Sequence, residues 1–240
     1  MEIIENLDVY GFKAGLRGMR NPKNSWSKLD SEFDGVTINM IGKNDLKLLL
    51  TLLISGPEHR KVLRMIHADY DATFTRGLWS EYDTYHFNTK NSCSTMHKLL
   101  DGKKIIDKSL FLYDPEDEEI IDTVIKRLEY LRQLYNNKET ENKTQYLIRA
   151  KRLLPEGFLQ KRTVSTNYEE LLTMYHQRKN HRMPEWKQFC KELKEKIPYL
   201  ALFIAVLEDN ELVKEIIEKY DDIKDTLMYF NIEEYKKNND

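Results

Sequence analysis

The chain has 240 residues, of which 40% are hydrophobic and 32% charged, and its net charge is -2. This length suits one large domain or two small ones, and the balanced charge gives no overall basic field for nucleic acid. Without an apolar run of about 18 residues or a leader-like N-terminus, we expect no membrane span or signal peptide. Cys93 and Cys190 lack CxxC spacing, which argues against disulfides or zinc and favours a reducing cytoplasm.

The first half of the chain mixes strand and helix signals with polar loops. Weak alternation predicts a strand in residues 2–12, and a polar composition predicts a long loop in 18–39 with a short strand at 35–39. A helix is predicted in 42–56, capped by Asn44 or Asp45 and ended by Gly56. Residues 61–74 read as a strand, and the polar stretch 79–97 fits either a loop or the wall of a polar ligand site.

From Asp114 onward, helical signals dominate. Asp114 as cap and Pro115 at the first helical position predict a helix over 114–137. Its apolar face consists of Ile121, Val124, Ile125, Leu128, Leu131 and Leu134.

Further helices are predicted at 144–154, 167–178 and 184–197. Pro155 ends the first, Asn167 caps the second and Pro184 opens the third. A strand is predicted at 157–166, and only helical signals follow Pro198. The sequence therefore predicts an α+β fold in which helices are in the majority.

The sequence lacks the motifs by which several enzyme classes are recognised. The chain contains no GxSxG, P-loop or GxGxxG motif. None of the six histidines forms a helical HxxxH pair, so no metal site is predicted.

Cations recur between residues 147 and 186, and most of them fit solvated surface charge. Arg178 differs, because it follows Tyr175 by three residues and lies on or beside the apolar stripe of its helix. An arginine in that position tends to pair with an anion or a planar polar partner. Together with helix N-termini, such cations would suit a phosphate-bearing ligand.

Residues 150–186 resemble the C-terminal signature of flavin-dependent thymidylate synthases, the ThyX family. That signature has an Ala-Arg-x-x-Leu-Pro turn, a strand, an Asn that opens a helix and an Arg eleven residues later. Pro155, Asn167 and Arg178 match these spacings without a gap, while Lys151, beside Arg152, replaces the first family arginine. Residues 56–69, which include His59, resemble the Gly-His-x5-His entry into the family's central strand. The resemblance covers roughly residues 40–200.

The centre of the signature is altered. The family has Arg-His-Arg, a short gap and then Asn-Glu-x-Ser-x-Arg-Tyr. Here Asn91 and Ser94 keep their positions, Thr84-Tyr85-His86 replaces the basic triplet, and Ser92 and Met96 replace the Glu and the final Arg. Residues 79–99 resemble a divergent, often phage- or prophage-borne branch without Arg-His-Arg, for which the host cytoplasm is the expected location.

The resemblance implies a ThyX-like sheet flanked by helices in residues 1–205, a helical extension over 206–240, and a homotetramer. It implies a pyrimidine nucleotide such as dUMP as the ligand, while the balanced charge and the hydropathy predict no nucleic acid or membrane partner. Arg178 would polarise the pyrimidine as the catalytic residue, and the nucleotide would also contact Ser94, Lys151, Arg152 and Glu81. Glu81 stands in place of a family glutamine near the phosphate, where a carboxylate repels the ligand unless a cation intervenes.

By the same resemblance, FAD would lie near His59, Tyr85, Asn91 and Asn167. Methylenetetrahydrofolate and NADPH would take part if the protein is an active enzyme. The altered triplet supplies at most one cation and Asp83 adds a negative charge, so we expect little or no FAD. Arg20, Arg60 or Arg162 could restore the missing charge.

Three interpretations stay open: an active flavin-dependent nucleotide methylase, an inactive relative that binds or sequesters a nucleotide, and a structural or interaction protein. Local alternatives stay open as well. Asn91 and Ser94 could cap a helix that begins near Thr95. Cys93 is expected to be a packed thiol, and the aromatic residues Trp79, Tyr82 and Tyr85 are expected in the core or at a subunit interface.

Overall fold

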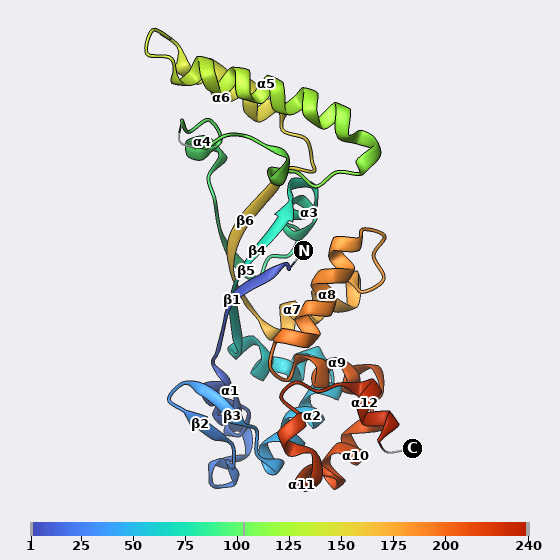
Figure 1. Cartoon of the computed structure of the whole chain (residues 1–240). Helices are drawn as coiled ribbons and strands as arrows, with labels where there is room; N and C mark the ends of the chain where they lie inside the picture. The colour runs from blue at the N-terminus through green and yellow to red at the C-terminus, as the bar shows by residue number, and fades with distance from the viewer. Residues whose placement is uncertain (1, 103, 239–240) are drawn as a thin grey trace. The chain divides into compact units, whose positions relative to one another are not determined.

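The computed structural model describes residues 2–102 and 104–238 (Figure 1). A four-stranded sheet has the strand order β1-β4-β6-β5. Its strands are β1 (Ile4–Tyr10), β4 (His67–Thr75), β6 (Leu159–Asn167) and β5 (Asn88–Ser92). A separate antiparallel pair joins β2 (Glu32–Asp34) to β3 (Thr37–Met40). With helices in most of the remaining chain, the predicted α+β class is confirmed.

The chain forms two compact units. Unit 1 contains the residues up to Asp71, Tyr85–Thr89 and the residues from Val164 onward, and unit 2 contains Ala72–Thr84 and Lys90–Thr163. The chain passes from one unit to the other within β4, β5 and β6. The division into a domain of residues 1–205 and an extension over 206–240 is a different one, and it stays a prediction.

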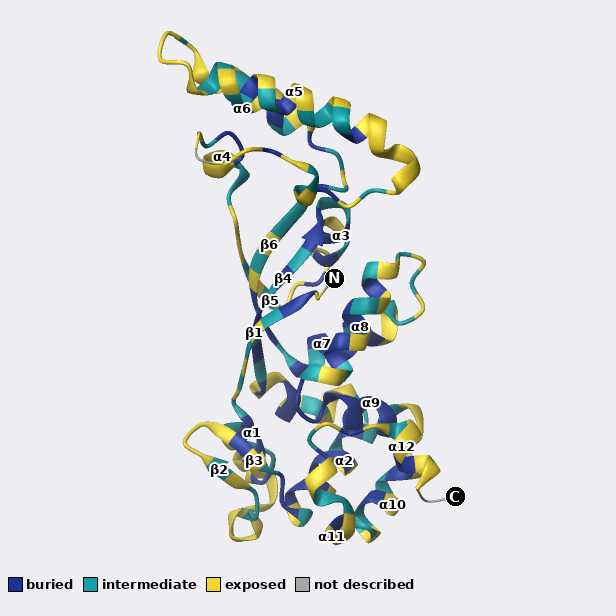
Figure 2. Ribbon diagram, in the orientation of Figure 1, coloured by how far each residue is buried: buried dark blue, intermediate teal, exposed yellow. Residues whose placement is uncertain are grey.

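Unit 1 is largely helical. Its helices are α1 (Phe12–Met19), α2 (Lys43–Ile54), α7 (Tyr168–Arg178), α8 (Pro184–Lys196), α9 (Leu200–Glu208), α10 (Leu212–Glu218), α11 (Tyr220–Ile223) and α12 (Ile232–Lys237). Residues 200–206 of α9 are all buried, so this helix forms the centre of the unit's core (Figure 2). α7 and α8 pack against each other and against α9. The helical C-terminal segment that the sequence predicts is confirmed.

A buried ion pair anchors the loop before β2 to α2. Arg20 Nε donates to Asp45 Oδ1 at 2.6 Å, and the two side chains are only 3% and 0% exposed. Asp30 lies in the same loop, and its carboxylate accepts from the backbone N–H groups of Asn44 at 2.8 Å and Asp45 at 3.0 Å. Asp30 therefore caps α2, and the expectation of a cap by Asn44 or Asp45 was wrong because the cap comes from across a loop.

Two other expectations in unit 1 need correction. β3 confirms the short strand predicted at 35–39, but the rest of residues 18–39 is not the long loop expected, because it contains the end of α1, two short 3-10 turns and β2. The strand expected over 61–74 begins only at His67, because Pro57–Met65 form a 3-10 helix.

The sequence analysis did not predict α1. Gly11 precedes this helix at the N-cap position, with a φ of 92°. A Cβ there would lie 2.1 Å from Met65 O, so the chain needs glycine at this turn.

Unit 2 has its own apolar core. Its helices are α3 (Arg76–Tyr82), α4 (Thr95–Lys98), α5 (Glu118–Asn136) and α6 (Lys143–Leu153). α5 and α6 pack together, and the core beneath them includes Leu128, Leu131, Leu147, Ala150 and Phe158. The predicted apolar face of α5 is therefore confirmed except for Leu134, which is not part of this core, and Pro115 lies in a short 3-10 turn just before the helix. In the described parts of the chain, no helix has both the length and the apolar character that crossing a membrane requires.

Candidate functional site

Arg178 is the last residue of α7, and the helix holds it in a defined place. α7 begins where β6 ends, and Asn167 Oδ1 accepts from Glu170 N at 3.0 Å, which confirms the predicted cap. Leu171 and Met174 are fully buried, so the helix is fixed on the core of unit 1. Its C-terminal residue therefore has little freedom of backbone movement.

The loop that carries Tyr85 is tied to the same elements. Phe87 N donates to Glu170 Oε1 at 3.1 Å, and Thr166 Oγ1 donates to Phe87 O at 3.2 Å. Within the loop, Asn88 Nδ2 donates to Tyr85 O at 2.9 Å. These bonds connect the loop to β6 and to the first turn of α7, and they fix the backbone position of Tyr85.

Tyr85, Gln177, Arg178 and Trp186 form one group, which we name the Arg178 cluster. Tyr85 Oη accepts from Arg178 Nε at 2.9 Å and donates to Gln177 Oε1 at 2.9 Å. The Arg178 guanidinium carbon lies 4.9 Å from the Trp186 ring centroid and 5.7 Å from that of Tyr85. Both rings are buried, so the cation rests on a rigid aromatic support.

The cluster confirms that Arg178 has a planar partner, as its position beside the apolar stripe predicted. Trp186 was missed by the sequence analysis. It lies in the first turn of α8, and no local motif connects it to Arg178.

Cys190 lies close enough to Arg178 to be affected by its charge. Burial raises the pKa of the Cys190 thiol to about 12, and the Lys194 and Arg178 cations only partly oppose this. Burial thus favours the protonated thiol, which is the less nucleophilic form.

The other site residues predicted in unit 1 do not join this cluster. Asn167 caps the start of α7, about 16 Å along the helix axis from Arg178. His59 is 51% exposed and lies in the 3-10 helix Pro57–Met65, with its Nε2 3.5 Å from Glu58 Oε1. It lines a hollow of about 330 Å³ together with Leu52 and Val62.

Unit 2 contains the remaining predicted residues. Ser94 precedes α4 at the N-cap position, but its side chain makes no capping hydrogen bond, and Asn91 lies exposed in β5. Capping therefore does not account for either residue. α4 packs against α6, whose last turn carries Lys151 and Arg152. Half-buried Glu81 belongs to α3.

Cys93 is exposed, so the expectation of a packed thiol was wrong. Its backbone N–H donates to Lys161 O at 3.0 Å, which holds the residue beside β6 just after the end of β5. In contrast, Trp79 and Tyr82 are fully buried, and their predicted core role is confirmed.

A second polar group in unit 2, which we name the Asp83 cluster, consists of Asp83, Lys90 and Arg162. Asp83 Oδ1 lies 3.0 Å from Arg162 Nη1 and 3.1 Å from Lys90 Nζ. The Arg162 guanidinium lies 4.3 Å from the centroid of Trp79, and Lys90 Nζ lies 5.2 Å from that of Tyr82. The sequence contained these residues, but nothing local indicated that α3, β5 and β6 would bring them together.

Within residues 2–102 and 104–238, no three or more His, Cys, Asp or Glu side chains are grouped so that they could hold a metal ion.

Two solved structures of Thymidylate Synthase X from Helicobacter pylori are similar to this chain. One, with FAD and dUMP at 2.31 Å resolution, gives a TM-score of 0.62 at 18% identity and covers 86% of this chain and 98% of that one. The other, also complexed with FAD and dUMP, gives a TM-score of 0.61 at 19% identity over 87% and 99%. The chain has a ThyX-like fold.

The ThyX-like fold agrees with the resemblance found in the sequence. No protein-family model matches the chain, and no curated protein matches it. At this identity the similarity establishes the fold, and the ligands FAD and dUMP belong to the Helicobacter pylori protein.

Proposed function

We propose that this protein binds a pyrimidine nucleotide, dUMP or a related one, and that Arg178 contacts the pyrimidine. The observation that carries the proposal is the placement of Arg178 on Tyr85 and Trp186 at the end of α7, within a ThyX-like fold. A guanidinium held against two rings loses little conformational freedom when a ligand binds. Its planar donors suit the polar edge of a pyrimidine.

Ser94, Lys151 and Arg152 stay predicted nucleotide contacts, and all three belong to unit 2. Ser94 begins a helix that packs against α6, and α6 carries Lys151 and Arg152 in its last turn. A hydroxyl and two cations on adjoining helices supply hydrogen-bond donors for the oxygen atoms of such a ligand. Glu81 would repel the phosphate, so its role depends on a cation between the two.

Flavin-dependent methylation of the nucleotide is the second candidate function, and the ThyX-like fold favours it. Methylenetetrahydrofolate would then supply the carbon and NADPH the reducing equivalents. His59, Tyr85, Asn91 and Asn167 would be the residues near FAD. In a methylase Arg178 would be the catalytic residue that polarises the pyrimidine.

The residues at the position of the basic triplet do not fit FAD well. Thr84 carries no charge, and the Tyr85 hydroxyl is bonded to Gln177 and Arg178. Two arginines that could have restored the charge are engaged elsewhere: Arg20 pairs with Asp45, and Arg60 Nη1 lies 3.9 Å from Glu169 Oε1. Nucleotide binding without flavin chemistry is therefore the function we favour.

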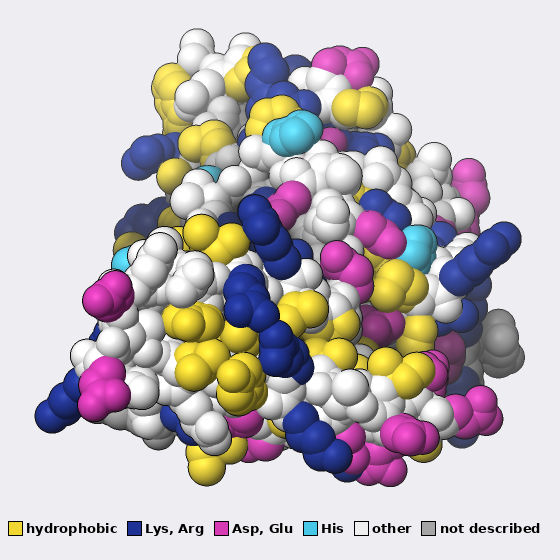
Figure 3. Space-filling view, turned by 90° about the horizontal axis from the view of Figure 1, so that it is seen from above, with side chains coloured by type: hydrophobic (Ala, Val, Ile, Leu, Met, Phe, Trp, Pro, Cys, Tyr) yellow, Lys and Arg dark blue, Asp and Glu magenta, His cyan; other side chains and the backbone are white. Residues whose placement is uncertain are grey.

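We also propose that the protein forms a homo-oligomer, with a tetramer as the expected state. The α5–α6 pair exposes apolar side chains that would gain from being covered: Ile120, Tyr130, Ile148 and Leu153 are 64%, 48%, 41% and 45% exposed. The space-filling view shows Lys and Arg side chains beside hydrophobic ones on the surface (Figure 3).

Calorimetry with dUMP, dTMP and dCMP tests the proposed function. We expect the wild type to bind at least one of them and Arg178→Lys to bind it roughly tenfold or more weakly, because lysine cannot donate two parallel hydrogen bonds. Arg182→Lys is the matched control, since Arg182 is exposed between α7 and α8. Equal binding by the wild type and Arg178→Lys would place the site elsewhere. No binding at millimolar concentration would favour an interaction protein.

A further inference from the structure

In the Asp83 cluster, two cations pair with one carboxylate, and each cation lies over an aromatic ring. Arg162 Nη1 contacts both carboxylate oxygens of Asp83, at 3.0 and 3.2 Å, and Lys90 Nζ contacts Oδ1 at 3.1 Å. The three groups come from the end of α3, from β5 and from β6, all within unit 2.

The cations in this cluster are held more firmly than the carboxylate. The Lys90 and Arg162 side chains are each 17% exposed, and both lie over rings that are fully buried. Arg162 Nε also donates to Gln160 Oε1 at 3.2 Å, and Gln160 O accepts from Trp79 Nε1 at 2.7 Å. Stacking and hydrogen bonding together leave the guanidinium little freedom.

Asp83 has a looser position. It follows the last residue of α3, and its side chain is 45% exposed. Its backbone N–H is bonded to Trp79 O at 2.8 Å, so the side chain can rotate away while the backbone stays in place. The carboxylate can therefore leave the two cations without any change in the helix.

We propose that Lys90 and Arg162 form a phosphate-binding site, and that Asp83 occupies it as an internal competitor until a phosphate group displaces it. A phosphate monoester carries a charge of about -1.5 to -2 and three acceptor oxygens, so it satisfies both cations better than one carboxylate does. The cluster also adjoins a segment with a predicted nucleotide contact. Gln160 Nε2 donates to Cys93 O at 2.9 Å, which links the cluster to the segment that carries Ser94.

This inference rests on the proposed function for the identity of the ligand, a nucleotide phosphate. It makes Asp83 a regulator of affinity, because every phosphate that binds must first break an internal ion pair. Removing the Asp83 charge should therefore strengthen the binding of phosphate-bearing ligands and leave an uncharged nucleoside unaffected.

The test is calorimetry of the full chain with dUMP, deoxyuridine and inorganic pyrophosphate. We expect Asp83→Asn to bind dUMP and pyrophosphate roughly threefold or more tightly than the wild type, with deoxyuridine unchanged. Arg162→Gln and Lys90→Gln should weaken dUMP binding by a similar factor. Circular dichroism melting of each variant shows that it is folded, and either cation variant alone is sufficient for the comparison.

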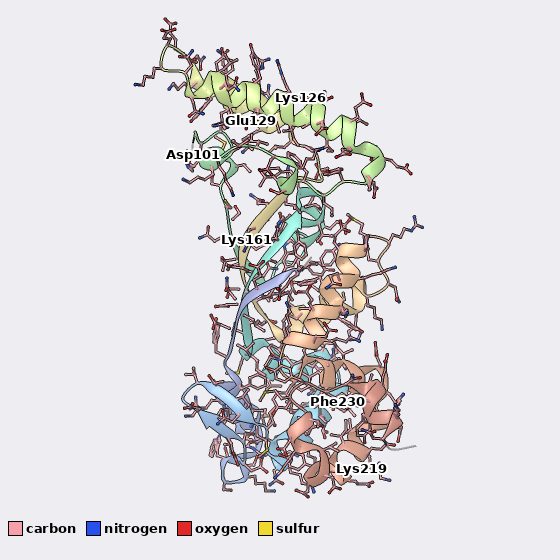
Figure 4. All side chains as sticks on the ribbon, in the orientation of Figure 1. Asp101, Lys126, Glu129, Lys161, Lys219 and Phe230 are labelled. Carbon is pink, nitrogen blue, oxygen red and sulfur yellow. The ribbon has the colours of Figure 1, made fainter. Side chains whose placement is uncertain are left out.

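The loss of the Asp83 carboxylate and the loss of a cation each have a matched control, at Asp101 and Lys161, which Figure 4 labels. Asp101→Asn also removes a carboxylate that is paired with a lysine, since Asp101 Oδ2 lies 3.2 Å from Lys98 Nζ. Lys161→Gln removes an exposed cation from β6 at the position next to Arg162, where strand alternation directs it to the other face. Neither control should change the affinity for dUMP or pyrophosphate.

The outcomes separate this inference from the proposed function. If Asp83→Asn binds dUMP and pyrophosphate no more tightly than the wild type, or if Asp101→Asn has the same effect, the phosphate site is wrong. That result leaves the proposed function intact where the Arg178→Lys comparison still holds. If no variant binds dUMP but Asp83→Asn gains affinity for pyrophosphate, the phosphate site stands and the nucleotide proposal fails.

Discussion

Arg178 and Tyr85 are 93 residues apart in the chain, yet Arg178 Nε donates a hydrogen bond to Tyr85 Oη at 2.9 Å. The tyrosine occupies the middle of the triplet that is basic in the ThyX signature. A neutral hydroxyl that accepts from the arginine thus stands where the resemblance would place a ring near flavin. The bond couples this altered motif directly to the residue proposed to contact the pyrimidine.

Tyr85→Phe should weaken nucleotide binding through Arg178. The change removes the acceptor for Arg178 Nε and the donor to Gln177, so the guanidinium loses one of its fixed contacts. We expect affinity for the bound nucleotide to fall severalfold and the free energy of unfolding to fall by about 0.5–1.5 kcal/mol. Calorimetry and urea denaturation measure the two effects.

Tyr235→Phe is the control for this change, since the Tyr235 hydroxyl bonds to Glu215 Oε2 at 3.4 Å instead of to Arg178. It should leave nucleotide affinity unchanged. If both tyrosine variants bind the nucleotide as the wild type does, the Tyr85 hydroxyl does not position Arg178.

Purified protein should carry little or no FAD. The reason is the charge around the triplet: Thr84 is neutral, and the Tyr85 hydroxyl is engaged by Gln177 and Arg178. The visible absorption spectrum after dialysis measures the flavin content. A yellow preparation with near-stoichiometric FAD would contradict this prediction and make the methylase the leading candidate.

Light scattering at micromolar concentration should report a mass well above the 28.7 kDa of one chain. We expect the double variant Ile120→Ser/Tyr130→Ser to lower that mass, because it removes two of the apolar side chains that α5 exposes. Val36→Ser serves as the control, since Val36 is 70% exposed but belongs to unit 1. A wild type that stays monomeric would contradict the proposed homo-oligomer.

Glu192 should make stability depend on pH. Its side chain is 3% exposed and accepts from Ile3 N at 2.9 Å and Ile4 N at 2.8 Å, which attaches the start of β1 to α8. Burial opposes the charge, but hydrogen bonds from Ile4, Gln188, Lys196 and Ile3 outweigh it and lower the pKa of Glu192. A folded-state pKa below the unfolded value stabilises the protein above about pH 4.5, and this contribution is lost as the pH falls through the folded pKa.

Glu192→Gln tests this dependence. It should lower the free energy of unfolding by about 1–3 kcal/mol at pH 7, and the difference from the wild type should shrink as the pH falls below about 4. Denaturant unfolding at several pH values measures it. Glu195→Gln is the control on the same helix, because Glu195 is 56% exposed and its pairing with Lys191 is at 3.7 Å. A difference that stays constant with pH would show that the charge of Glu192 is not its source.

The sequence by itself determined the elements whose signals are local. Asn167 caps α7, Pro184 opens α8 and the apolar positions of α5 face its core, because caps and helical periodicity involve residues within about four positions of each other. The order of Pro155, Asn167 and Arg178 was enough to indicate the ThyX-like fold that the solved structures support.

Only the tertiary structure decided which side chains meet. Asp30 caps α2 from across a loop, Trp186 supports Arg178 from the next helix, and Asp83 joins cations from β5 and β6. None of these contacts follows from propensity or spacing, because each depends on how separate elements pack. The exposure of Cys93 was missed for the same reason, since burial is a property of the folded chain and not of its local sequence.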